Sequence, residues 1–388
     1  MTAAAPSDTA PSTGAVATGP RDPHDRVGRR LRSLDLLRGV TVAGMITVNA
    51  TAGVQSLDKP VFATLLHAEW TGFTVADTVF PAFLTMVGVS IAISSRGDAA
   101  GAAATRRVLA RAARMILIGL LLGHMFFLAD FHKYGVRLPG VLQRIGIVFA
   151  ICALLYPRTD TRVRTIVAVA LLLGYWLLCL LPVPGGQATD LWVPGHNFVS
   201  WVDRIVLGEW RYVKGPFGYD PEGLLGTLPA VAQALLGTLA GDFLRRGLPV
   251  VRTSKALLIA GLAGAAAGLA WGMLFPIAKN LWTSSFVLLS TGLTVAMLGL
   301  FHWWFDRDDR PARKGDLFGS FGRNAIAAYV LHEVASIILT GDAIQLPFKV
   351  LAPLVGTQVA ALAPVALFVT IVWYPIAYMD RRGWYLRV

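Results

Sequence analysis

Residues 34–95 read LDLLRGVTVAGMITVNATAGVQSLDKPVFATLLHAEWTGFTVADTVFPAFLTMVGVSIAISS, and this stretch indicates what kind of fold the whole chain has. It contains two apolar segments, near 34–53 and 75–95, joined by one polar loop. Each segment has roughly the 20 residues that a helix needs to cross a bilayer. The pattern predicts a pair of membrane-spanning helices whose connecting loop lies at one membrane face.

Polar residues of the kinds that perform catalysis collect around this loop. His67, Glu69 and Trp70 lie within it. Asn49 comes near the end of the first apolar segment, and Asp77 comes at the start of the second. If the two segments cross the membrane as neighbours, these side chains meet at the same face. We therefore expect the chemistry here, with the remaining chain as a scaffold.

The composition of the whole chain is that of a membrane protein. Of its 388 residues, 55% are hydrophobic and 15% are charged, and the mean hydropathy is +0.59, which is far from the averages of soluble proteins. Residues 1–30 are rich in Ala, Pro, Ser, Thr and Gly and predict a disordered cytoplasmic tail. Residues 31–388 are expected to form one transmembrane domain.

Further apolar segments follow the first two, so the predicted fold is an all-α polytopic transmembrane bundle of about ten spans. These segments fall near 110–129, 138–156, 165–183, 222–244, 255–275, 281–304, 317–339 and 353–378. A re-entrant piece at 344–353, which contains Pro347 and Pro353, would make an eleventh.

The basic residues predict the orientation of this bundle. Most of the 35 lysines and arginines fall in the tail, the even-numbered loops and the C-terminus, and few fall in the odd-numbered loops. Loops rich in Lys and Arg stay in the cytoplasm. Both termini are therefore expected in the cytoplasm of a multi-pass protein of the cell (plasma or inner) membrane, and His67 outside. The net charge of +12 is then a sign of topology, and no nucleic-acid partner is expected.

The longest outer loop, 184–221, combines tryptophans and tyrosines with several acids. Aromatic faces and carboxylates together can hold a sugar. Membrane interfaces also collect Trp and Tyr, so both interpretations stay open at this point.

Several separate motifs occur in one order along the chain. They are LRSLDLLRG (31–39), the VNA around Asn49, LLHAEWTGFTVADTVFPAFLTMVGVSI (65–91), VRLPGVLQRIGI (136–147), YDPEGLLGTL (219–228), KNLW (279–282) and GRNAIAAYVLHEV (322–334). In this order the chain resembles the heparan-α-glucosaminide N-acetyltransferase family. It resembles a bacterial-type homologue without the large N-terminal extracytoplasmic domain of the animal enzymes.

The resemblance implies transfer of an acetyl group from cytosolic acetyl-CoA to the amine of a terminal glucosamine beyond the membrane, with no metal. The active-site histidine of the family matches His67, and its active-site asparagine matches Asn49. The residue types agree, because an imidazole can accept a proton from an attacking amine near neutral pH. An Asn amide could donate to the thioester oxygen as it becomes an oxyanion, or orient the imidazole. The predicted partners are acetyl-CoA, an amino-sugar or glycan acceptor, the bilayer and, in a homo-oligomer, other copies of the chain.

Other polar residues are candidates for substrate contacts or support of the site. Asp77 has the spacing of a helix cap after Thr74, and Asp220 and Glu222 also have the positions of a cap and a first-turn acid, so each has a structural alternative. Ionisable groups inside a span usually face the bundle interior. The candidates are Asp77, Trp70, Glu69, Arg144, Gln143, Asp220, Glu222 and His332.

Three residues at the cytoplasmic side are candidates for binding acetyl-CoA. Arg323 and Asn324 begin the ninth predicted span, where a guanidinium and a helix N-terminus could meet a phosphate together. Arg38 is a further candidate, although it could simply pair with Asp35 on one helix face.

The sequence lacks the signatures of several other enzyme classes. It has no GxxxxGK[ST] loop, GxSxG elbow, CxxC pair or HExxH pair, which argues against an NTPase, a serine hydrolase or a zinc enzyme. Two alternatives to an N-acetyltransferase remain. One is a transporter or flippase for a glycan or lipid precursor, and the other is a transmembrane O-acyltransferase.

Overall fold

The computed structural model describes residues 31–54, 62–95, 101–125, 137–307, 313–339 and 341–386. The predicted tail at 1–30 lies outside the described residues. Within the described ranges the regular structure is entirely helical. The all-α prediction is therefore confirmed for this part of the chain.

Most of the α-helices are long, whereas α6 and α10 are short. In chain order they are α1 (Arg32–Val54), α2 (Val79–Ser94), α3 (Ala102–His124), α4 (Val141–Leu155), α5 (Thr161–Cys179), α6 (Phe198–Leu207), α7 (Thr227–Leu244), α8 (Val250–Trp271), α9 (Ser284–Phe305), α10 (Leu317–Arg323), α11 (Ala325–Ala335), α12 (Asp342–Val355) and α13 (Thr357–Arg382). Short 3-10 turns adjoin several of them, including η3 (Ala76–Thr78) before α2 and η4 (Tyr156–Arg158) after α4.

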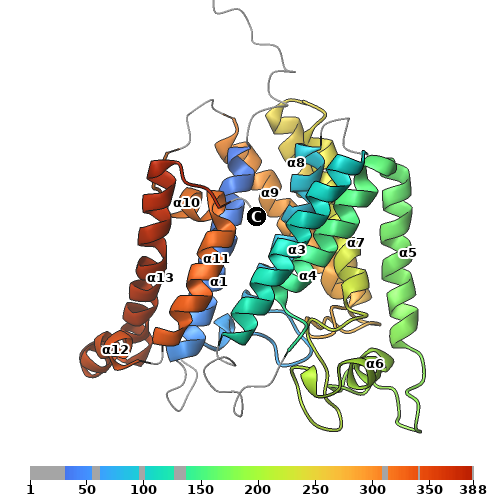
Figure 1. Ribbon diagram of the computed structural model, residues 1–388, viewed down its shortest axis with the longest axis horizontal. Coiled ribbons are helices and arrows are strands. Elements are labelled where there is room, and N and C mark those ends of the chain that lie inside the picture. Colours follow the sequence, from blue (N-terminus) through green and yellow to red (C-terminus); the bar gives the residue numbers. More distant parts are fainter. Residues whose placement is uncertain are drawn as a thin grey trace, which may run out of the picture.

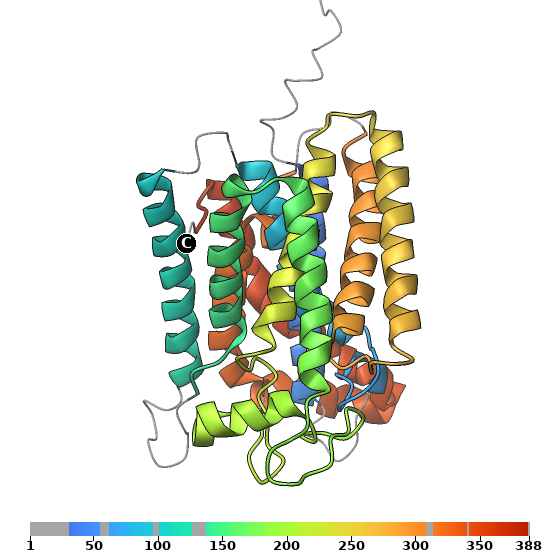
Figure 2. The same ribbon diagram turned by 90° about the vertical axis from the view of Figure 1, so that its right-hand side faces the viewer.

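The long helices run side by side and form one bundle (Figure 1, Figure 2). Helices α6 and α12 lie across one end of this bundle, and the described C-terminus lies toward the other end, near α10 (Figure 1). We name these the α6 end and the α10 end. The loop that carries His67 belongs to the α6 end, because α1 enters from the α10 end and α2 returns to it.

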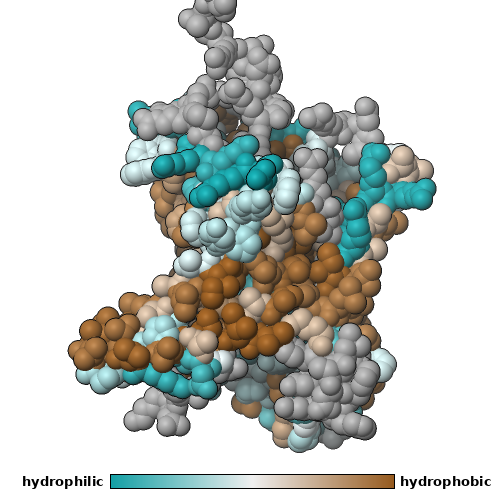
Figure 3. Space-filling view, turned by 60° about the vertical axis from the view of Figure 1, so that its left-hand side comes forward, coloured by the Kyte–Doolittle hydropathy of each residue, from teal (hydrophilic) through white to brown (hydrophobic). Residues whose placement is uncertain are grey.

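In the part of the chain that the structure describes, seven helices or helix–turn units are long and apolar enough to cross a membrane, or eight if one bent pair counts as a span. They are Ala76–Ser94, Val141–Arg158, Thr161–Cys179, Thr227–Leu244, Val250–Trp271, Ser284–Phe305 and Thr357–Arg382. Apolar side chains such as Leu177 on α5 and Ile259 on α8 are exposed, as expected for a surface that contacts lipid. Figure 3 shows hydrophobic residues gathered over the middle of one face, with hydrophilic ones above. The chain is a multi-pass membrane protein.

The predicted count of ten spans is not supported, and the differences have local causes. Helices α1 and α3 exist where spans were expected, but Asn49 and the threonines of α1 and the arginines of α3 lower their apolar character. The expected span at 317–339 is divided at Asn324 into α10 and α11. The expected re-entrant piece lies within α12, which bends by 71° from the preceding helix, as in a broken span or a re-entrant segment.

Helices α2 and α7 cross with their backbones in contact. A Cβ added to Gly88 would lie 1.9 Å from the carbonyl oxygen of Ala234, and one added to Gly237 would lie 2.1 Å from that of Thr85. Such distances leave no room for a side chain at either position. The two glycines therefore set the separation of α2, which follows Asp77, from the central helix α7.

We expect Gly88→Val to destabilise the protein by about 3 kcal/mol, the upper range for overpacking, because the displaced atoms belong to the backbone of α7. The unfolding temperature of the protein in detergent measures this loss. Gly174→Val on α5 is the matched control, since a Cβ there meets nothing within 4 Å. Equal effects of the two substitutions would contradict the close crossing.

Candidate active site

A cavity of about 700 Å³ lies between helices α1, α2, α3, α4 and α11 and extends along the bundle. Its lining is polar toward the α6 end, where it includes Asn49, His67, Glu222, Lys279 and Glu333. Apolar side chains such as Phe80, Phe83, Met115 and Ile145 line the middle. Arginines line it toward the α10 end, namely Arg38, Arg111 and Arg323. One continuous space thus joins the predicted catalytic loop to the predicted acetyl-CoA contacts.

His67 is held by the buried carboxylate of Asp77. The distance from His67 Nδ1 to Asp77 Oδ1 is 2.8 Å, and Asp77 is completely buried. The other oxygen, Oδ2, accepts hydrogen bonds from Ala68 N at 3.2 Å, Thr74 N at 3.1 Å and Thr74 Oγ1 at 3.0 Å. Because Asp77 is an acceptor, the Nδ1 proton of His67 is assigned to this contact, and Nε2 remains for a reacting group. Asp77 thus both stabilises the turn and orients the imidazole.

Lys279 is a second neighbour of His67 that sequence reasoning missed. Its Nζ lies 2.9 Å from His67 Nδ1 and 3.7 Å from Asp77 Oδ1. Burial lowers the pKa of Lys279, and the nearby Asp77 opposes that change. The only signal in the sequence was the KNLW motif, which names no role for its lysine.

Asn49 is held by His332, which lies behind it. Asn49 Nδ2 is 3.3 Å from His332 Nε2, and His332 is buried against the ring of Phe368. His332 does not line the cavity, whereas Asn49 does. An Asn amide carries two N–H donors, so one can serve His332 while the other points to a ligand.

Asp220 and Glu222 share Arg137, a residue that the sequence did not indicate. Arg137 donates to both oxygens of Asp220, at 3.1 and 2.6 Å, and to Glu222 Oε2 at 2.5 Å. Asp220 is buried and also accepts from Tyr212 N at 2.9 Å. Glu222 is the member of this group that reaches the cavity.

At the α10 end, two of the arginines that line the cavity contact carboxylates. Arg323 donates to both oxygens of Asp380 at 2.6 Å and to Asp316 at 3.2 Å. Arg38 donates to Ser90 Oγ at 2.8 Å and lies 3.5 Å from Asp35 Oδ1. Arg323 thus faces two carboxylates, one of them in a bidentate pair, and both arginines line the cavity.

Arg111 and Asn324 complete the description of the α10 end. The Arg111 guanidinium lies over the Phe149 ring, 4.8 Å from its centroid, and lines the cavity, although sequence reasoning did not name it. Asn324 is buried at the break between α10 and α11, where its Oδ1 accepts from Leu386 N at 3.4 Å. Asn324 is not among the lining residues, so the structure places it behind the cavity wall.

The chain is similar in sequence to known proteins along most of its length. The family model described as "Heparan-alpha-glucosaminide N-acetyltransferase, catalytic" matches residues 30–193, which include Asn49, His67 and Asp77. The human heparan-alpha-glucosaminide N-acetyltransferase (Homo sapiens) is 30% identical over 359 residues, covering 79% of this chain and 53% of the human protein. The chain is similar to the heparan-α-glucosaminide N-acetyltransferases over most of its length. The mouse protein of the same name (Mus musculus) is 29% identical over 364 residues, with the same two coverages of 79% and 53%. The chain spans about half the length of these curated relatives.

Two predicted site residues of the His67 loop serve the surrounding fold. Trp70 is buried, donates from Nε1 to Leu191 O at 3.0 Å, and packs edge-on against Tyr219 with centroids 4.9 Å apart. The Glu69 side chain is exposed, and its carbonyl oxygen accepts from Asn280 Nδ2 at 2.7 Å. Neither residue lines the cavity.

Arg144 and Gln143 are buried in α4 and do not line the cavity either. Arg144 Nη2 donates to Gly223 O at 3.0 Å, and its guanidinium lies 5.0 Å from the centroid of the Trp282 ring. Among the described residues no carboxylate lies within ion-pair distance of Arg144, whose guanidinium contacts a carbonyl and an aromatic face. Gln143 packs against Gly119 of α3, which holds α3 to α4.

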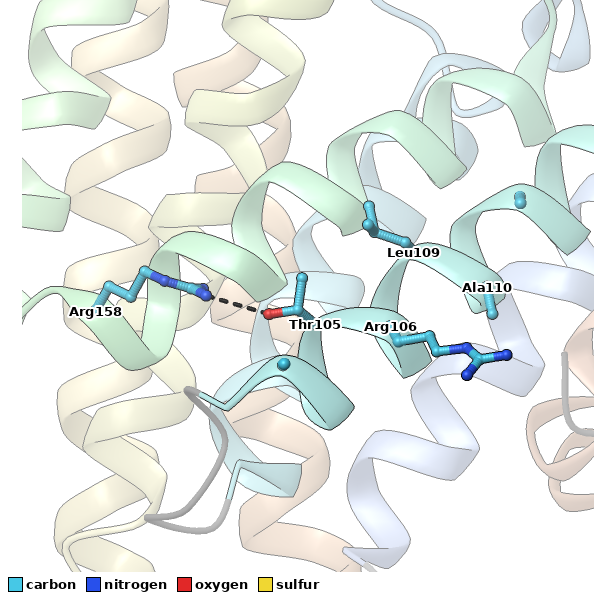
Figure 4. Close-up of a pocket in the computed structure, with 7 residues that line it drawn as sticks. Thr105, Arg106, Leu109, Ala110 and Arg158 are labelled. Atoms are coloured by element: carbon cyan, nitrogen blue, oxygen red, sulfur yellow. Dashed lines mark hydrogen bonds between the residues drawn. The ribbon is translucent and has the colours of Figure 1, made fainter.

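A second hollow lies on the surface of the protein, and the residues that line it include no group suited to acyl transfer. It is an open groove lined by residues that include Thr105, Arg106, Leu109, Ala110 and Arg158. Arg158 donates to Thr105 Oγ1 at 3.2 Å, and Arg106 points away from both (Figure 4). Across the described ranges of the chain, no group of three His, Cys, Asp or Glu side chains could hold a metal ion.

Asp203 holds the segment before α7 in place. Its environment indicates that the stability of the protein depends on pH. This buried carboxylate accepts from Asp220 N and Leu224 N, both at 3.2 Å. Burial raises the pKa of Asp203 to about 7, with a further contribution from the charge of Asp220. An unfolded Asp has a pKa of about 3.9, so folding favours the protonated form. The contribution of Asp203 to stability is thus fully present below about pH 4 and is lost as the pH rises through about 7.

We therefore expect the unfolding temperature to fall between pH 5 and pH 8, and to fall less in Asp203→Asn, which carries no titrating group. Thermal unfolding of both proteins across that pH range measures the difference. Parallel pH profiles of the two proteins would contradict the assignment.

Proposed function

We propose that this chain is a membrane-bound acetyltransferase that moves an acetyl group from acetyl-CoA to the amine of a glucosamine-type sugar or glycan. The observation that carries the proposal is that one continuous cavity has Arg38 toward one end and His67, paired with Asp77, at the other. The homology with N-acetyltransferases supports the same reaction class.

The dimensions of the cavity suit an elongated donor. Arg38 and Asn49 both line it and are separated by eleven positions of α1, or roughly 16 Å. In our proposal the phosphates of CoA lie toward Arg38 and Arg111, the pantetheine arm follows the apolar middle, and the thioester reaches Asn49. The α10 end then faces the cytoplasm with both termini, and His67 faces outward, as the distribution of basic residues predicts.

The proposed reaction uses His67 to move one proton. The acceptor nitrogen attacks the thioester carbon, so an N–C bond forms and the C–S bond breaks. His67 Nε2 accepts the proton that the nitrogen loses and returns it to the departing CoA thiolate. The free N–H of Asn49 donates to the carbonyl oxygen as it gains negative charge.

The carboxylates at the α6 end suit an acceptor that arrives as an ammonium ion. Glu222 and Glu333 both line the cavity near His67 and Lys279. A carboxylate can hold the ammonium and accept its first proton for release to solvent, which leaves the neutral amine that the reaction requires. The cavity thus supplies separate groups for the two protons of the amine.

Incubating the purified protein with labelled acetyl-CoA and a panel of amino sugars tests this function. We expect labelled N-acetylated glucosamine. The cavity reaches toward both ends of the bundle, which also favours the alternative of a transporter or flippase. Movement of the sugar across vesicles without any acetylated product would support that alternative, and an alkali-labile ester product would indicate O-acylation.

Arg38→Ala is expected to weaken acetyl-CoA binding by roughly tenfold or more, because a hydrogen bond to a charged group is worth about 1.5–3 kcal/mol. The KM for the amino sugar should change little, since Arg38 lies toward the other end of the cavity. Binding of acetyl-CoA to the purified variant measures the effect. Arg162→Ala, at an exposed position, is the matched control, and parent-like binding by Arg38→Ala would exclude the proposed phosphate contact.

A further inference from the structure

Lys279 lies closer to the imidazole of His67 than an ordinary surface lysine would. Its Nζ is 2.9 Å from His67 Nδ1 and 3.7 Å from Asp77 Oδ1, and only 15% of its side chain is exposed. The ammonium and the carboxylate therefore meet at the same ring nitrogen. No step of the proposed transfer uses Lys279 directly.

The loop that carries Lys279 is built to hold it there. Trp282 has a φ of 54°, and it is the one non-glycine residue in the described ranges with a positive value. This costly conformation is fixed because Trp282 is buried and donates to Gln233 Oε1 at 3.1 Å. The same loop is tied to the His67 loop by Gly72 N donating to Ile277 O at 2.8 Å. Strain held in place by several contacts is typical of functional sites.

The two charges next to His67 act in opposite directions. A carboxylate 2.8 Å from an imidazole nitrogen favours the imidazolium form, and an ammonium 2.9 Å from the same nitrogen disfavours it. At nearly equal distances the two Coulomb energies are similar in size and opposite in sign. Without Lys279, the imidazole of His67 would lie beside the carboxylate of Asp77 with no ammonium at the same nitrogen.

Within the described ranges, the other charged groups around His67 are not placed to replace Lys279. The side chain of Glu69 is exposed, and Glu222 is engaged by Arg137. From the other elements around the site, the ionisable groups are Asp220 beside α7 and Tyr329, His332 and Glu333 on α11. Most of these are acids, so Lys279 is the cation that offsets Asp77 at the imidazole.

We propose that Lys279 is a positioning residue that keeps His67 in its neutral, proton-accepting form by balancing the charge of Asp77. This inference rests on the proposed function, in which His67 must begin each turnover without a proton. It assigns to the KNLW loop an electrostatic role that is separate from substrate binding. Asp77 orients the ring, and Lys279 limits how strongly Asp77 retains the imidazolium.

The pH profile of the rate in Lys279→Met tests this role. The acidic limb of kcat/KM is expected to move to higher pH by about one to three pH units, the range caused by one opposite charge nearby. The activity lost near pH 6.5 should therefore return toward the parent level at alkaline pH. Lys279→Arg, which keeps the charge, should retain the parent profile. Lys214→Met, an exposed lysine of the outer loop, is the matched control for loss of one charge.

A second measurement does not depend on turnover. NMR titration of histidine-labelled protein, with the His67 signal assigned by its loss in His67→Gln, follows the imidazole directly. In Lys279→Met the His67 titration should move upward with the rate profile. An unchanged His67 titration in a folded Lys279→Met protein would overturn the inference. Absence of acetyl transfer by the parent would instead count against the proposed function, and the titration would still decide the role of Lys279.

Discussion

His67→Ala is expected to lower kcat by roughly 10²-fold or more, the usual contribution of a general base, while acetyl-CoA still binds as in the parent. The reason is that Nδ1 of His67 is occupied by Asp77 at 2.8 Å, which leaves Nε2 to accept the proton of the acceptor amine. Steady-state rates with saturating acetyl-CoA measure the loss. His196→Ala, which replaces a half-buried histidine of the loop 184–221 stacked on Phe217, is the matched control and should stay within about twofold of the parent rate.

A related question is whether the acetyl group passes directly from acetyl-CoA to the acceptor or is first carried by His67. In our proposal one cavity holds both the donor end and the acceptor end, so both substrates bind together and no acetyl-enzyme is required. A labelled acetyl group trapped on His67 without acceptor, at a rate that matches turnover, would exclude direct transfer. It would still leave His67 at the centre of the reaction.

Asn49→Ala is expected to lower kcat by roughly 10²-fold as well, the effect of removing one oxyanion donor. Asn49 lines the cavity, and its amide is oriented by His332 Nε2 at 3.3 Å. The loss should appear in kcat more than in the dissociation constant of acetyl-CoA, because the oxygen gains charge only during the reaction. Full activity in a folded Asn49→Ala protein would show that the donor lies elsewhere.

Local sequence pattern was sufficient for part of the site. The His67 loop lies between two apolar segments, and the Thr74–Asp77 spacing indicated a turn, so both local conformation and the side of the bundle followed from short-range pattern. The structure also places Asp77 directly on His67, ten positions away. Contacts between residues that lie this close in sequence, within one loop, can be inferred from local pattern.

Contacts that depend on packing between distant segments could not be predicted. Lys279 meets His67 across 212 positions, and Arg323 meets Asp380 across 57. Arg144 similarly finds the Trp282 ring instead of an acid. The periodicity of the sequence does not predict these contacts, because each depends on how the helices pack against one another.

The span count differed from the prediction for a related reason. A hydropathy pattern assumes continuous helices facing lipid, whereas α1 buries a polar face on the cavity and α10 breaks from α11 at Asn324. Residues such as Arg38 and Asn49 lower the apolar character of a helix that runs through the bundle. The polar residues of the candidate site thus lower the hydropathy of the helix that carries them, so that this helix no longer has the composition of a typical membrane span.

Acetyl transfer in sealed vesicles tests most directly the central claim that one cavity joins a donor end to an acceptor end. The purified protein is reconstituted with glucosamine trapped inside and labelled acetyl-CoA, which is charged and stays outside, added to the medium. We predict labelled N-acetylglucosamine within the vesicles, and none with His67→Ala. Product formed only when both substrates are supplied on the same side would contradict the claim.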